Sequence, residues 1–162
     1  MTLGTRVEAA QSRRFRVVRR AGAYADISFA AAIVDLFDVS GLCAVYYMFG
    51  VCTTVIGAGV CTPRIQFTPT VGAARVPLCL AAAAINADAA GTIYTWDGLL
   101  GGQLAPGAAL GASDALATWA GGFITLAAGV IDLDVAVDAV SGVIDWYVMY
   151  LPIAAGAVIT SA

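Results

Sequence analysis

The acidic side chains are the residues of this sequence best placed to do chemistry. Asp132 and Asp134 lie two positions apart, on one face of a predicted strand, and Asp138 follows further along. Asp145 falls on the next predicted strand, which could pair with the first. Oxygen-only clusters of this kind can hold Ca²⁺, but the solvated polar face of a strand accounts for the same residues. We favour the solvated face and expect no metal site.

Four cysteines, Cys43, Cys52, Cys61 and Cys79, are the only thiols. Their spacings of 9, 9 and 18 residues fit no C-x-x-C metal or redox motif, and the chain has no His to complete a mixed site. The same absence leaves no imidazole to activate a nucleophilic thiol. An even number of cysteines permits disulfides in an oxidising compartment. We favour buried free thiols that pack as small apolar groups.

The chain lacks most of the side chains that enzymes use. It has no His, no Lys and a single glutamate, Glu8. General acid–base catalysis by imidazole, Schiff-base chemistry and the P-loop phosphate grip are therefore excluded. The Gly-rich residues 98–111 also lack the strand-to-helix pattern of a nucleotide loop. We predict a non-enzymatic protein with no catalytic residues, no cofactor and no small-molecule substrate.

Positive charge is concentrated at the N-terminus. The first twenty residues hold six Arg against Glu8, a balance of +5, whereas the remainder holds two Arg against ten Asp, a balance of −8. We predict a basic arm over residues 1–22 that docks on an acidic partner surface, followed by one domain over residues 23–162. A solvated terminus is the alternative. Nucleic acid is a less favoured partner because Phe15 is the only interleaved aromatic residue. The candidate docking residues are Arg13, Arg14, Arg16, Arg19 and Arg20.

The chain as a whole is too apolar for an ordinary single domain. Of 162 residues, 60% are hydrophobic and 12% are charged, against about 25% charged in typical soluble domains. The surplus must meet lipid or another protein. Residues 39–63 carry no charge and are long enough to span a membrane as a helix. However, Gly50, Gly57 and Gly59 interrupt this run, and its densest part is rich in aromatic and β-branched residues, which favours a strand.

The elements that position these residues are predicted to be short strands. Ile131, Leu133 and Val135 alternate with Asp132 and Asp134, which is the period of a half-buried strand. Turn residues recur every eight to twelve positions, Ser141-Gly142 is predicted to close a hairpin, and Pro152 to end the last long strand. This spacing predicts an all-β, antiparallel sandwich or jelly-roll-like domain. The predicted strands cover residues 42–49, 64–68, 92–96, 131–138 and 143–151.

Much of the chain also resembles a group of small virion proteins of tailed bacteriophages. In that group a "G-x-I-D-L" strand precedes a "S/T-G-x-I/V-x-W/F-x-V-x-Y-x-P-L" strand and a short "G-A-x-V" tail. The resemblance covers residues 26–162 at low stringency and leaves out the arginine-rich start. The matching segments are residues 129–133, 141–153 and 156–158, with weaker matches at 53–54, 69–72, 78–79 and 88–94.

The resemblance implies a β-sandwich subunit on the surface of a phage capsid, of the decoration or cement type, assembled in the host cytoplasm. Its implied partners are further copies of itself, as in a trimer, and the major capsid protein. We expect the strand over residues 146–152 to supply a core shared between copies, with Trp146, Tyr147 and Tyr150 as contact residues beside the arginines. A tail-tube or other virion subunit, and a small integral membrane protein, are the alternatives.

Overall fold

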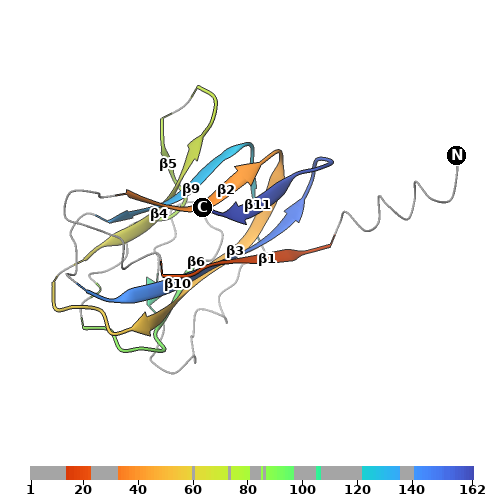
Figure 1. Ribbon diagram of the computed structural model, residues 1–162. Helices are drawn as coiled ribbons and strands as arrows, with labels where there is room; N and C mark the ends of the chain where they lie inside the picture. The colour runs from red at the N-terminus through yellow and green to blue at the C-terminus, as the bar shows by residue number, and fades with distance from the viewer. Residues whose placement is uncertain are drawn as a thin grey trace, which may run out of the picture.

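Two antiparallel sheets packed face to face make up the fold (Figure 1). The computed structural model describes residues 14–22, 33–59, 61–72, 74–80, 85, 87–96, 105–106, 122–135 and 141–162. Within these ranges all regular structure is β-strand. The predicted all-β antiparallel sandwich is therefore confirmed.

The first sheet, sheet A, is built around its two longest strands, β3 and β10. The order is β1-β10-β3-β6-β7, and β8 also pairs with β3. The edge of β3 that faces away from β10 is shared: β8 pairs with its start and β6 with its middle. The strands are β1 (Arg16–Arg20), β3 (Cys43–Thr54), β6 (Ile93–Trp96), β7 (Ala105–Pro106), β8 (Ile124–Leu126) and β10 (Val143–Pro152).

The second sheet, sheet B, has β9 at its centre. The order is β11-β2-β9-β4-β5, and every pairing is antiparallel. The C-terminal strand β11 forms one edge of sheet B, on the same side of the sandwich as β1 of sheet A (Figure 1). The strands are β2 (Ile33–Ser40), β4 (Pro63–Pro69), β5 (Val76–Pro77), β9 (Gly129–Val135) and β11 (Val158–Ser161).

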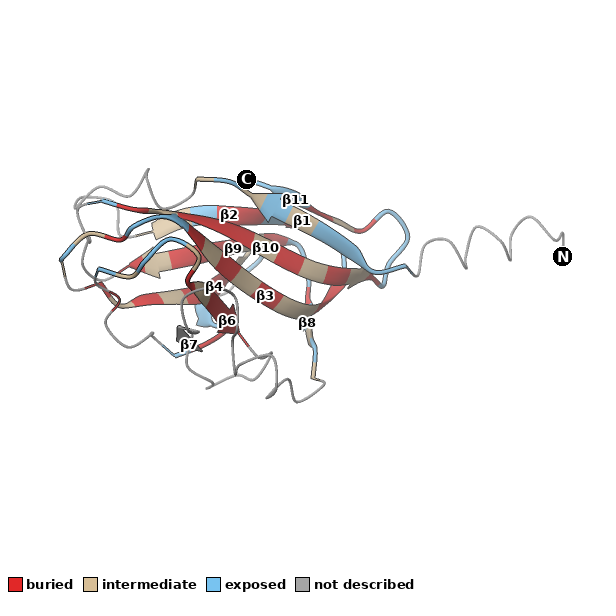
Figure 2. Ribbon diagram, turned by 90° about the horizontal axis from the view of Figure 1, so that it is seen from below, coloured by how far each residue is buried: buried red, intermediate tan, exposed pale blue. Residues whose placement is uncertain are grey.

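Alternation along each strand decides which side chains enter the core between the sheets. In β9, Ile131, Leu133 and Val135 are buried there, and Asp132 and Asp134 lie on the opposite side of the sheet, as the sequence predicts. Asp132 is not solvated as expected, because only 2% of it is exposed, and Asp138 lies outside the described residues. The same alternation is visible along β3 and β10 as bands of buried and half-buried residues (Figure 2). The four-residue core face of β10 is Ile144, Trp146, Val148 and Tyr150.

The hairpin predicted at Ser141-Gly142 is wrong. Gly142 does adopt a φ of +121°, and the N–H of Gly57 donates to the carbonyl of Ser141 over 2.9 Å. However, β9 belongs to sheet B and β10 to sheet A, so the two strands do not pair. Two consecutive apolar strands can bury the same core from opposite sheets, and periodicity alone does not distinguish this from a hairpin. Asp145 consequently lies on the sheet opposite Asp132 and Asp134.

Within the uncharged run, the described residues 39–59 and 61–63 contain no helix. Their central part is β3, which runs through the middle of sheet A, and residues 55–59 follow it without regular structure. Among the described residues, no helix has the length and apolar character needed to cross a membrane.

The centre of sheet A depends on a close approach between β3 and β10. Gly50 lies directly opposite Trp146 in the ladder, and both face the core. A Cβ atom on Gly50 would lie 2.7 Å from Cγ2 of Ile144 and 3.0 Å from the six-membered ring of the Trp146 indole. The Trp146 indole thus occupies the space that a side chain at position 50 would need.

Replacing Gly50 with alanine is expected to destabilise the fold by about 1–3 kcal/mol, because neither neighbour can yield without leaving its packed rotamer. Thermal unfolding followed by circular dichroism would measure the loss. Val51→Thr is a suitable control, since the next residue faces outward and should cost about 1 kcal/mol or less. Equal stability of Gly50→Ala and wild type would contradict this account of the core.

Candidate interaction surfaces

In the described part of the chain, no group of three or more His, Cys, Asp or Glu side chains is arranged to hold a metal ion. All four cysteines are buried and none forms a disulfide bond, the state that the sequence favours. Burial raises the pKa of the Cys43 and Cys52 thiols, which disfavours the reactive thiolate. Candidate functional features therefore have to be sought on the surfaces.

The predicted basic arm is in part a strand of sheet A. Arg16, Arg19 and Arg20 lie in β1, which pairs with β10 from Arg16 opposite Tyr150 to Arg20 opposite Trp146. Arg14 lies just before this strand, and Arg13 lies outside the described residues. The sandwich thus includes residues that the sequence assigns to the arm, and β1 forms the edge of sheet A.

A three-way interaction at Asp145 fastens β1 to the sheet. The Arg19 guanidinium donates to Oδ2 of Asp145 from Nη2 at 2.5 Å and from Nε at 3.2 Å. The N–H of Gly22 donates to Oδ1 at 2.9 Å. Only 8% of the Asp145 side chain is exposed. Burial opposes ionisation of this carboxyl, but the hydrogen bonds from Arg19 and Gly22 and the Arg19 charge together hold its pKa below the usual value.

Arg19→Ala is expected to lower the free energy of unfolding at neutral pH, because it removes two N–H donors and the positive charge from the buried Asp145 carboxylate. Since the folded-state pKa of Asp145 is depressed, this contribution is present above the ordinary value of 3.8 and disappears as the pH falls through the folded-state pKa. Denaturant unfolding of both proteins across that range would measure the difference.

Arg64→Ala provides the control for this experiment, because Arg64 makes a comparable ion pair with Asp134 on sheet B. Hydrogen exchange separates the two variants: amides of β1 should exchange faster in Arg19→Ala and remain unchanged in Arg64→Ala. Unchanged β1 exchange in Arg19→Ala would show that the backbone ladder alone holds the strand.

The other arginines of this segment have no acidic partner among the described residues. Arg14 and Arg16 are exposed, and no ion pair involves either of them. Arg20 donates from Nη1 to the carbonyl of Ala21, while its Nε is buried without a hydrogen-bond partner. Three positive charges therefore remain available at this edge of the sandwich.

The aromatic residues of β10 divide between the core and the surface. Trp146 and Tyr150 are buried between the sheets of a single chain, so neither is free to contact a partner as the sequence analysis expects. Tyr147 faces outward and stacks on Phe49, with ring centroids 4.7 Å apart and planes within 5°. Of the three predicted contact residues, only Tyr147 lies on the outer face of sheet A.

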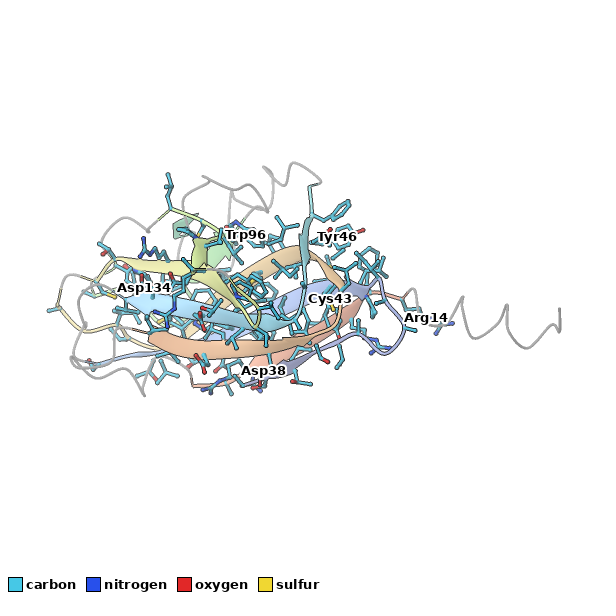
Figure 3. All side chains as sticks on the ribbon, turned by 90° about the horizontal axis from the view of Figure 1, so that it is seen from above. Arg14, Asp38, Cys43, Tyr46, Trp96 and Asp134 are labelled. Atoms are coloured by element: carbon cyan, nitrogen blue, oxygen red, sulfur yellow. The ribbon has the colours of Figure 1, made fainter. Side chains whose placement is uncertain are left out.

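A second group of aromatic rings, which was not predicted from the sequence, lies at the end of this face. We call Phe15, Tyr46 and Phe123 the aromatic patch. The Tyr46 ring lies between the other two, 4.8 Å from Phe15 and 5.2 Å from Phe123. Phe15 is 57% exposed and Phe123 is 53% exposed. Figure 3 places Tyr46 at the same end of the molecule as Arg14.

An irregularity in β3 presents Tyr46 at this position. Between Met149 and Tyr150 the β10 ladder advances one residue while its partner moves from Tyr47 to Val45, so Tyr46 is the extra residue of a bulge. Aromatic residues from three separate parts of the chain meet there. The bulge is a tertiary feature, and alternation in the sequence carries no signal for it.

The outer face of sheet B is polar by contrast. Arg64 forms an ion pair with Asp134, and Thr68 donates to Asp132. Asp35 lies directly opposite Asp132 in the β2–β9 ladder. Burial raises the pKa of Asp132, and the neighbouring Asp35 carboxyl adds to the rise, against the opposing effects of Thr68 and Arg75. The sandwich therefore has one aromatic and one acidic face.

Asp132→Asn is expected to stabilise the protein by up to about 1 kcal/mol at neutral pH, because it removes a like charge opposite Asp35 while keeping an acceptor for Thr68. The raised folded-state pKa means that wild type loses stability as the pH rises from 3.8 through that pKa. The advantage of the variant should therefore vanish in acid. Chemical denaturation at several pH values measures it, and a destabilised variant at neutral pH would contradict the assignment.

Comparison with known proteins gives no match: no protein-family model, no curated protein and no solved structure is significantly similar to the chain. Function is therefore inferred from the fold, the surfaces and the sequence.

Proposed function

We propose that this chain is a non-enzymatic structural subunit that works through protein–protein contacts, and more narrowly a capsid decoration subunit of a tailed bacteriophage. The observation that supports contact formation is the aromatic patch beside the unpaired arginines at one end of sheet A. Aromatic rings and arginines dominate the binding energy of protein interfaces. The narrower proposal rests on the resemblance of residues 26–162 to virion proteins.

The two faces of the sandwich suggest how such a subunit would be oriented. The outer face of sheet A carries Phe49, Tyr147 and the aromatic patch, so it is the face that gains most from being covered. The outer face of sheet B carries Asp35, Asp38 and the ion-paired Asp134, which suit exposure to water. In this proposal sheet A meets further copies or the major capsid protein, and sheet B faces outward.

The proposed mechanical role of the subunit depends on the contacts it makes with its neighbours. A decoration subunit bridges neighbouring shell proteins and resists the pressure of the packaged genome, so it needs contacts that hold without chemistry. Copies arranged around a symmetry axis, as in a trimer, would cover the aromatic patch of each subunit. This assignment predicts a homo-oligomer whose formation depends on the patch.

Replacing Phe15 and Phe123 with serine is expected to weaken self-association by about tenfold or more, since each exposed aromatic contributes 1 kcal/mol or more when buried at an interface. Sedimentation velocity over a concentration series measures the shift. Val71→Ser is the control, because Val71 is 86% exposed on the turn after β4 and lies outside the patch.

Electron microscopy of the purified protein distinguishes a decoration subunit from a tail-tube subunit. Closed small oligomers agree with a decoration subunit, whereas stacked rings or tubes would indicate a tail-tube subunit. A wild-type protein that stays monomeric at all concentrations, or a patch variant that associates as wild type does, would overturn the proposed contact surface. Circular dichroism confirms that the variants keep the β fold.

A further inference from the structure

Strand β1 presents a hydrogen-bonding edge. It pairs with β10 on one side, and no other described strand forms a ladder with it. Figure 2 shows β1 as a largely exposed strand beside β11, which belongs to the other sheet. The backbone groups on this side are therefore a template for another extended segment. The Asp145 interaction with Arg19 and Gly22 holds this template in place.

The side chains of β1 restrict what could pair there. Arg16, Val18 and Arg20 share one face of the strand, and Val17 and Arg19 share the other. Asp145 already neutralises Arg19, whereas Arg16 and Arg20 have no acidic partner among the described residues. The Nε of Arg20 is moreover buried without a hydrogen-bond partner. Arg16 and Arg20 are four residues apart, which is about 13 Å along a strand.

A second copy of β1 is a poor occupant of this edge. In an antiparallel pair the sequence Arg16-Val17-Val18-Arg19-Arg20 brings arginines of the two copies opposite or diagonal to one another in every register. Like charges in those positions destabilise a ladder. The arginines thus protect the edge from self-pairing and favour a strand of opposite charge.

We propose that the free edge of β1 binds an extended segment of a partner protein that carries two carboxylates four residues apart on either side of an apolar residue. The backbone ladder supplies affinity, the carboxylates pair with Arg16 and Arg20, and the apolar residue lies next to Val18. This inference rests on the proposed role in protein–protein contacts and specifies the partner. Nucleic acid could satisfy the charges but has no backbone that completes a β-ladder.

The test is a titration of the ¹⁵N-labelled full chain with the acetylated and amidated peptide Thr-Asp-Thr-Val-Thr-Asp-Thr. Amide shifts are expected to concentrate in β1 and to saturate in the micromolar to millimolar range. The peptide with Asn in place of both Asp residues should bind about tenfold more weakly. The peptide with Pro in place of its central Val should lose binding, because proline disrupts the ladder.

Protein variants provide the reciprocal control. Arg16→Gln combined with Arg20→Gln should weaken the acidic peptide about tenfold, while Arg75→Gln, on the other sheet, should not. If the double variant fails to fold, the three peptides on wild type still decide the question. Absence of β1 shifts, equal binding of the proline peptide, or tighter binding of a single-stranded oligonucleotide would each overturn strand addition. None of these results alters the sedimentation behaviour that tests the aromatic patch.

Discussion

The packing of the Trp146 indole over Gly50 is the constraint on which the rest of the structure depends. It brings β3 and β10, the two longest strands, into register at the centre of sheet A. Every other strand of that sheet attaches to one of these two or through them: β1 to β10, β6 and β8 to β3, and β7 to β6. A side chain at position 50 would compete with the tryptophan for one volume, so glycine here is a packing requirement and not a turn signal.

The side chains that fill the core determine which apolar residues are left on the outer faces of the two sheets. Large side chains from both sheets, including Trp96, Tyr94 and Phe37, are already fully buried. The next apolar residues along β3 and β10 must therefore point outward, which makes the outer face of sheet A aromatic. Sheet B alternates with aspartate instead and stays polar outside. The outer face of sheet A is thus aromatic, whereas the outer face of sheet B carries charged side chains.

Strands β2, β5, β7, β8 and β11 were not predicted from the sequence, and β1 was assigned to a basic arm. Apolar patterning did predict strands at β3, β4, β6, β9 and β10, because strand formation there follows from local geometry. Ile131 and Leu133 against Asp132 and Asp134 is the clearest case. Pairing was not predictable in the same way, since β10 pairs with β3 and not with the neighbouring β9, and its Trp146 lies opposite Gly50. The aromatic patch depends on a bulge at Tyr46, and the Arg19–Asp145 pair joins residues 126 positions apart. The candidate site is assembled by tertiary contacts that no local pattern encodes.

The arginines in and beside strand β1 differ in whether they have an acidic partner within the chain. Arg19 is required within the chain, because Asp145 lies on a mostly apolar face and is stable as a carboxylate only with its donors. Arg14, Arg16 and Arg20 satisfy no carboxylate among the described residues. Removing all the arginines together would therefore break the Arg19–Asp145 interaction and also remove the unpaired charges. If β1 binds a partner strand as we propose, substituting Arg19 alone would test folding, and substituting Arg14, Arg16 and Arg20 would test binding.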